Sequence, residues 1–213
     1  MATATSEILE EIATERRAMA DLIDTLTPEQ WDTPSLCGEW TVGETCAHLL
    51  MPLVTSGGAL LVGVLTAGGF DKYNDRATRA FAKRPPDEIS AGLREHAESR
   101  FHPPTLTHAA PLSDIMLHGQ DIRRPLGLTR DFSELTLRTA LGQLTGPKAH
   151  RGFVPKRMRL GDGLKFVATD LEWEWGSGEL VAGPAASIAY AMTGRTASLG
   201  ELTGPGVEVL RTR

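Results

Sequence analysis

Hydrophobic residues recur at helical spacing through the first two thirds of the chain. Within residues 6–26 the apolar positions lie near one face of a helix; they are Ile8, Ile12, Ala13, Met19, Leu22, Ile23 and Leu26. Similar patterns predict helices over residues 74–83, 87–101, 112–124 and 131–144. Pro85 and Pro86 favour a helix start, and Pro125 ends the helix that precedes it. The first part of the chain therefore predicts a helical bundle.

Another helix is predicted to begin near Val42. Thr41 is suited to be its N-cap, and Glu44 follows three residues later, which is the spacing of a capping box. The helix carries His48 about two turns from its start. Because the neighbouring residues are apolar, an imidazole at this position needs a partner.

The stretch from Thr45 to Phe70 contains no Asp, Glu, Lys or Arg. A run of this length satisfies the length rule for a membrane span. His48, Pro52 and two Gly-Gly pairs interrupt it, and no basic cluster flanks it to set an orientation. We therefore interpret the stretch as buried core helices and expect no membrane association.

The pattern changes after residue 146. Residues 147–157 are basic and punctuated by proline, which is unfavourable for a helix and predicts a boundary between domains at 1–146 and 147–213. Beyond the boundary, the patterns predict β-structure, a short helix and a final strand, over residues 164–181, 184–195 and 206–213 respectively. The expected fold class is α+β and mainly α, with a small C-terminal α/β domain.

Composition and charge limit the partners. Hydrophobic residues make up 41% of the 213 residues and charged residues 23%, as in ordinary globular proteins. The net charge of −5 argues against a broad nucleic-acid-binding surface, so small molecules are the expected partners. Two cysteines, with no signal peptide apparent, do not make a disulfide framework. We expect a cytoplasmic protein, monomeric or a small homo-oligomer.

One pair of residues has the spacing of metal ligands. Asp114 and His118 are four residues apart on a predicted helix, so both side chains lie on one face. Alone, such a pair is more often a surface ion pair or a cap. His48 adds a second imidazole, which is either hydrogen-bonded in the core or a third ligand. Two imidazoles and a carboxylate leave an open position on Zn²⁺, Ni²⁺ or Fe²⁺.

Other polar residues near His118 have two interpretations each. Asp121 is three residues further along, where it can orient the imidazole or form an ion pair with Arg124. Arg123 and Arg124 can hold a carboxylate substrate or a thiol cofactor, or they form a solvated helix end.

Cys46 is not predicted to be a ligand, and Cys37 is not predicted to be an activated nucleophile. Cys46 is two residues before His48, so on a helix it points about 200 degrees away from it. Cys37 needs a lowered thiol pKa to be a nucleophile, and no basic residue is near it in the sequence. Trp31 and Trp40, which flank the same loop, are expected to anchor it against the core.

Three segments resemble one family. The run TPSLCGEWTVGETCAHL, from Thr33, is similar to the W-x-x-P-T-L-C-x-x-W-T-V…H-L motif of mycothiol-dependent maleylpyruvate isomerase and its relatives. DIMLHGQDIRRPLG resembles the second metal segment of that family, and residues 167–195 resemble its C-terminal domain. The resemblance implies a DinB-like bundle of four main helices followed by a small, sterol-carrier-like α/β domain.

The resemblance also implies site residues. His48, Asp114 and His118 match the metal positions of the family, although the isomerase is expected to carry Glu where this chain has Asp114. Arg195 resembles an arginine that faces the site and binds an anionic group. The implied function is a metal-dependent, mycothiol-dependent cis–trans isomerase or S-transferase acting on a small electrophilic acid, with zinc as the expected metal. The alternative is a non-catalytic metal-binding or small-ligand-binding protein.

Overall fold

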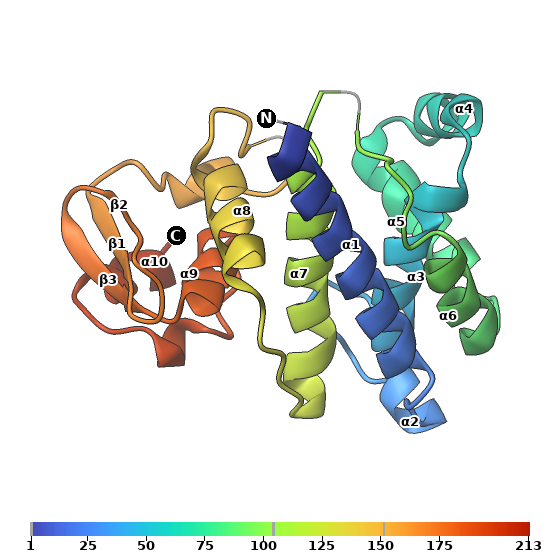
Figure 1. Cartoon of the computed structure of the whole chain (residues 1–213), viewed down its shortest axis with the longest axis horizontal. Coiled ribbons are helices and arrows are strands. Elements are labelled where there is room, and N and C mark those ends of the chain that lie inside the picture. Colours follow the sequence, from blue (N-terminus) through green and yellow to red (C-terminus); the bar gives the residue numbers. More distant parts are fainter. Residues whose placement is uncertain (1, 104, 151) are drawn as a thin grey trace. The chain divides into compact units, whose positions relative to one another are not determined.

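The structure is a computed structural model that describes residues 2–103, 105–150 and 152–213 (Figure 1). Arg151, in the predicted basic connection, and Pro104, in a proline-rich loop, lie outside the described residues. The chain divides into two compact units, residues 1–101 with 118–129, and residues 102–117 with 130–213. The domain boundary after residue 146 stays a prediction.

The first unit is built from helices. They are α1 (Ala2–Ile23), α2 (Pro28–Trp31), α3 (Val42–Val54), α4 (Gly57–Ala67), α5 (Phe70–Phe81), α6 (Pro86–Glu95) and the end of α7 (Ala109–Arg123). Helix α1 packs along α6, and α3 contacts both α5 and α6. The periodic residues Ile12, Met19 and Ile23 of α1 are fully buried, as the sequence pattern predicts. Pro125 follows α7 in a short 3-10 turn, Arg124–Leu126.

A buried arginine joins α1 to the end of α6. The guanidinium of Arg16 donates to the carbonyl oxygens of His96, Ala97 and Ser99 at 3.2, 3.0 and 2.8 Å. These carbonyls lie at or just beyond the C-terminus of α6, where helix carbonyls lack intrahelical partners. Arg16 is only 4% exposed, so this polar residue belongs to the core rather than to the solvated face of α1.

The uncharged stretch folds into two helices with opposite surroundings. Most of α3 is buried, but α4 has no buried residue, and its Leu61, Val62 and Leu65 are 62, 61 and 72% exposed. The interpretation of the whole stretch as buried core is therefore wrong for α4. The physical reason is that α4 packs against α5 through the Gly63–Tyr73 contact, which leaves its large aliphatic side chains outside. Among the described residues, no helix combines the length and apolar character needed to cross a membrane.

The second unit contains the sheet. Its elements after α7 are α8 (Glu134–Thr145), β1 (Leu164–Ala168), β2 (Glu174–Gly176), β3 (Glu179–Gly183), α9 (Ala185–Met192) and α10 (Gly206–Arg211). The strand order is β2-β1-β3, with β1 antiparallel to β2 and parallel to β3. Helix α9 packs on β1 and β3, and α8 packs on α9. The predicted β-structure and short helix are present.

The predicted final strand is wrong, because residues 206–211 form α10. Val207 and Leu210 are buried three positions apart, which fits one face of a helix and not the alternation of a strand. Pro205 precedes the helix, and its fixed φ is compatible with a helix start.

Candidate metal centre

The start of α3 is fixed by the predicted capping box. The Glu44 backbone N–H donates to Thr41 Oγ1 at 3.1 Å, and the Thr41 N–H donates to Glu44 Oε2 at 3.0 Å. Both halves of the box are present, so the prediction from the sequence is confirmed. Because the helix starts at a defined residue, the direction of His48 is set as well.

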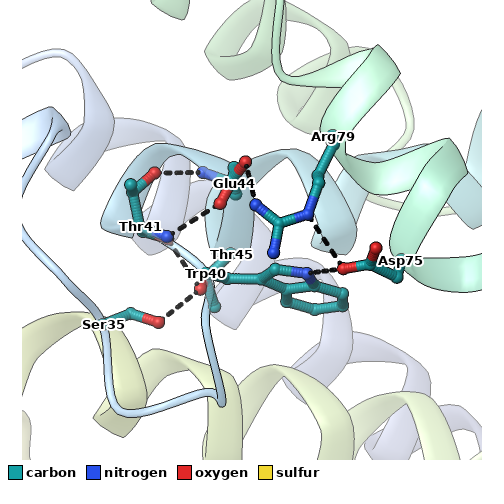
Figure 2. A network of polar contacts seen from close by, with 7 residues as sticks. All are labelled: Ser35, Trp40, Thr41, Glu44, Thr45, Asp75 and Arg79. Atoms are coloured by element: carbon teal, nitrogen blue, oxygen red, sulfur yellow. Dashed lines mark hydrogen bonds and ion pairs between the residues drawn. The ribbon is translucent and has the colours of Figure 1, made fainter.

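Helix α5 holds the same helix start through a network of side chains (Figure 2). Trp40 Nε1 donates to Asp75 Oδ1 at 2.9 Å, and Arg79 Nε donates to the same oxygen at 3.0 Å. A second Arg79 nitrogen donates to Glu44 Oε1 at 3.0 Å. The indole hydrogen bond, followed by that of Arg79, lowers the pKa of Asp75. Trp40 is thereby fixed in orientation beside α3.

Trp40 in turn lies against His48. Their ring centroids are 5.1 Å apart with the planes tilted by 40°, and the centroid of the His118 ring lies 4.8 Å from that of His48, nearly edge-on. The sequence predicts only loop packing for Trp40 and indicates neither the hydrogen bond to Asp75 nor the contact with His48. The local signal in the sequence is that Trp40 immediately precedes the N-cap of the helix.

The predicted ligands come together. Potential ligand atoms of His48, Asp114 and His118 all lie within 4.8 Å of one another. The division between the two units passes through α7 after Leu117. Asp114 nevertheless lies on the same continuous helix as His118, one turn before it, so the helix itself sets their relative position. All three residues are intermediate in exposure: the His118 side chain is 12% exposed, and the His48 Nδ1 atom is buried.

Asp121 contacts one of these ligands directly. His118 Nδ1 and Asp121 Oδ2 are 2.9 Å apart, and Asp121 is fully buried. A carboxylate that accepts the Nδ1 hydrogen fixes the imidazole orientation and leaves Nε2 as the acceptor atom, which is the nitrogen available to an ion. This geometry is compatible with the predicted orienting role, which stays a prediction.

The three arginines have different surroundings. Arg123 is 6% exposed and donates to the Gly119 carbonyl, so its side chain is buried and does not belong to a solvated helix end. Arg124 donates through two nitrogens to Gln120 Oε1 at 3.1 and 2.9 Å. Arg195 belongs to the second unit and follows α9, where it donates to Thr193 Oγ1 at 2.9 Å. Their predicted roles toward a substrate or thiol are not tested by these contacts.

A second group of potential ligands shares His118. The atoms of Cys37, His118 and Asp121 also lie within 4.8 Å of one another. No basic residue is near Cys37 in the sequence, but the fold brings the His118 imidazole of α7 close to its thiol. Cys46 is different: burial raises the pKa of its thiol to about 12.

Comparison with known proteins identifies relatives. The family model for the mycothiol maleylpyruvate isomerase N-terminal domain matches residues 12–123. The crystal structure of the mycothiol-dependent maleylpyruvate isomerase is similar at TM-score 0.64 and 16% identity, over 94% of this chain and 92% of that chain. A variant of it with one histidine replaced by alanine gives TM-score 0.63 with the same identity and coverage. No curated protein matches this chain in sequence.

The likeness to the solved isomerase confirms the expected fold class, a mainly helical DinB-like bundle followed by a small α/β region. At 16% identity it establishes the fold and not the substrate. Since the family model covers more than half of the sequence, the chain belongs to the mycothiol maleylpyruvate isomerase N-terminal domain family.

Proposed function

We propose that this protein is a metal-dependent enzyme that uses mycothiol, a low-molecular-weight thiol, to isomerise a small electrophilic cis acid. The observation that carries the proposal is the group formed by His48, Asp114 and His118, whose potential ligand atoms lie within 4.8 Å of one another. Membership of the isomerase family and the fold of the solved isomerase support it. The proposed substrates are small molecules, and the proposed location is the cytoplasm.

The donor set fits a divalent ion. Two imidazole nitrogens and one carboxylate oxygen suit Zn²⁺, Ni²⁺ and Fe²⁺, and we propose Zn²⁺. When bound, such an ion favours the thiolate form of a thiol near neutral pH and polarises a carbonyl group. Asp121 keeps the His118 ring in one orientation, so its Nε2 lone pair is directed outward.

The proposed reaction begins with the thiolate of the small thiol. Its sulfur forms a bond to one carbon of the activated double bond, and the electron pair of that double bond moves onto the conjugated acyl group. The remaining carbon–carbon single bond rotates, the sulfur–carbon bond breaks, and the thiolate leaves the trans acid behind. In the S-transferase version, the sulfur stays attached to the electrophile.

Three arginines are proposed to hold negatively charged groups. Arg195 is proposed to bind a carboxylate of the substrate, and Arg123 and Arg124 the thiol cosubstrate. Guanidinium groups suit this task because they bind carboxylates with two parallel hydrogen bonds. These assignments follow the family resemblance. They can be tested apart from the metal site, because replacing an arginine changes none of the three proposed metal ligands.

The alternative function is metal or small-ligand binding without catalysis. It is favoured by Asp114, because the isomerase is expected to carry the longer Glu at this position. A shorter side chain changes where an ion lies relative to the substrate, and it can leave the protein able to bind metal without turning over the acid.

Turnover separates the two functions. The metal-loaded protein is incubated with mycothiol and a cis unsaturated keto acid, and the trans product is measured by absorbance and chromatography. The proposal predicts turnover that needs both metal and thiol and that is lost in His48→Ala with an unchanged circular dichroism spectrum. A rate equal to that of thiol in buffer, across a panel of electrophiles, would contradict it.

A further inference from the structure

We propose that Asp75 is a positioning residue of the metal centre, which acts through the indole of Trp40 to hold the plane of the His48 imidazole. This inference rests on the proposed metal centre and adds a residue from α5, a helix that carries none of the candidate ligands. The Trp40 and His48 ring centroids are 5.1 Å apart, and Trp40 Nε1 donates to Asp75 Oδ1 at 2.9 Å. Figure 2 shows how the indole spans the distance between the start of α3 and Asp75.

A ligand imidazole needs neighbours that fix its plane. The second side-chain torsion of histidine has a broad distribution, so the ring turns readily unless its surroundings restrain it. For His118, the contact with Asp121 at 2.9 Å provides the restraint. For His48, the neighbouring rings are those of Trp40 and His118, with centroids 5.1 and 4.8 Å away. The plane of the His48 ring is therefore coupled to the position of Trp40.

Trp40 is held at its backbone and at its side chain. Its N–H donates to the Cys37 carbonyl at 3.2 Å, and its carbonyl accepts from the Ser35 N–H at 2.9 Å. The indole is buried and has a single hydrogen-bond donor, Nε1, which is used on Asp75. The indole hydrogen bond is the largest cause of the lowered pKa of Asp75, so this carboxyl is ionised near neutral pH. A hydrogen bond to an ionised carboxylate is stronger than one between neutral groups, which suits a restraint.

Asp75 also has a structural task, which the test has to separate from positioning. Arg79 donates to Asp75 Oδ1 at 3.0 Å and to Glu44 Oε1 at 3.0 Å, so this arginine docks α5 against the start of α3. A purely structural role would end with this docking and would leave the His48 ring unaffected. A positioning role extends through Trp40 to His48.

Four variants of the full chain make the separation. Asp75→Ala removes the acceptor of the indole hydrogen bond, and Trp40→Phe removes the donor but keeps an aromatic ring. Asp75→Asn is the conservative variant, since its amide oxygen can still accept from the indole. Asp24→Ala is the matched control. Asp24 is another carboxylate that pairs with an arginine, Arg94, at 2.6 Å, and its side chain is 43% exposed compared with 52% for Asp75.

NMR of the metal-free protein measures the His48 ring directly. Because the indole ring current acts on a neighbouring imidazole, the His48 ring signals report where Trp40 lies. We expect parent-like His48 signals in Asp75→Asn and Asp24→Ala, and shifted, broadened signals in Asp75→Ala. Unchanged His48 signals in Asp75→Ala overturn the proposal. If Asp75→Ala does not fold, the line width of the His48 signals in Trp40→Phe decides, since broadening reports a less restrained ring.

Zn²⁺ affinity, measured by competition with a chelator, is the second readout. We expect affinity to fall about 3- to 10-fold in Asp75→Ala and Trp40→Phe, less than for a residue that touches a ligand directly. We expect parent-like affinity in Asp75→Asn and Asp24→Ala. An equal loss in Asp24→Ala, or no loss in Asp75→Ala, overturns the role of Asp75 and leaves the metal centre intact. A parent that binds no Zn²⁺ overturns both.

Discussion

Helices α3 and α4 are consecutive and mainly apolar, yet their surroundings are opposite. Eight residues of α3 are buried, whereas none of α4 is. Helix α3 packs against both α5 and α6, and Leu50 lies so close to α6 that a Cβ on Gly92 would be 2.5 Å from it. Apolar composition therefore does not decide burial; the neighbours that a helix finds decide it.

The candidate metal ligand His48 lies on the better supported of these two helices. His48 lies in the helix whose start is fixed by a capping box and by side chains of α5 (Figure 2). A ligand must be held within a fraction of an ångström, which a packed and capped helix achieves. Helix α4 has its N-cap at Ser56 and a contact through Gly63, but no comparable support from buried side chains.

The largest expected difference in stability between the two helices comes from truncating a leucine in each. Leu50→Ala in α3 is expected to lower the free energy of unfolding by about 2–5 kcal/mol, because it leaves a cavity in the core. Leu65→Ala in α4 removes a side chain that is 72% exposed, so the free energy of unfolding should change by less than about 0.5 kcal/mol. Urea denaturation of both variants measures the two changes in the free energy of unfolding. Equal losses of stability would contradict the conclusion that α3 belongs to the core and α4 does not.

The next effect concerns the ligand geometry supported by α7. Asp121→Asn replaces the carboxylate that accepts from His118 Nδ1, and we expect metal affinity to fall about 10- to 100-fold. Titration with a competing chelator measures it. Glu98→Gln, an exposed change on the ion pair with Arg17, is the control and should leave affinity unchanged. An unchanged affinity in Asp121→Asn would show that this carboxylate does not support the ligand.

A smaller effect distinguishes the two helix caps. Thr41→Ala removes the N-cap of α3 and should cost about 1 kcal/mol of global stability, because α3 belongs to the core. Ser56→Ala removes the N-cap of α4, where Ser56 Oγ accepts from the Ala59 N–H at 3.2 Å. We expect this change to increase amide exchange in α4 with little change in the global transition. A loss of global stability in Ser56→Ala as large as that in Thr41→Ala would mean that α4 and α3 unfold together.

The smallest effect is a pH dependence. The Trp40 and Arg79 hydrogen bonds lower the pKa of Asp75 below its ordinary value of 3.8. A lowered folded-state pKa stabilises the fold above the unfolded-state pKa, and this contribution is lost as pH falls through the folded-state pKa. The stability difference between parent and Asp75→Asn should therefore be constant near neutral pH and shrink below pH 3.8. A difference that grows in acid would contradict this assignment.

Local signals in the sequence predicted local structure well. The Thr41–Glu44 capping box and the end of α7 before Pro125 depend on nearby residues, and both are found where expected. The strand predicted at residues 206–213 was wrong because a short apolar pattern fits a strand or a helix equally.

The remainder of the site depends on contacts between distant segments. The exposure of α4, the contact of Trp40 with His48, and the approach of Cys37 to His118 are long-range features that no local pattern encodes. The three candidate ligands could be predicted from the sequence, because Asp114 and His118 share one helix face and His48 is a polar residue in an apolar helix.

The central claim is the metal centre, and elemental analysis tests it most directly. Protein purified without chelators or an affinity tag is compared with His48→Ala, His118→Ala and the control His96→Ala, which belongs to neither candidate ligand group, with folding checked by circular dichroism. The account predicts close to one equivalent of metal in the parent and in His96→Ala, and none in the other two variants. A folded parent that contains no metal and takes up neither zinc nor nickel would contradict it.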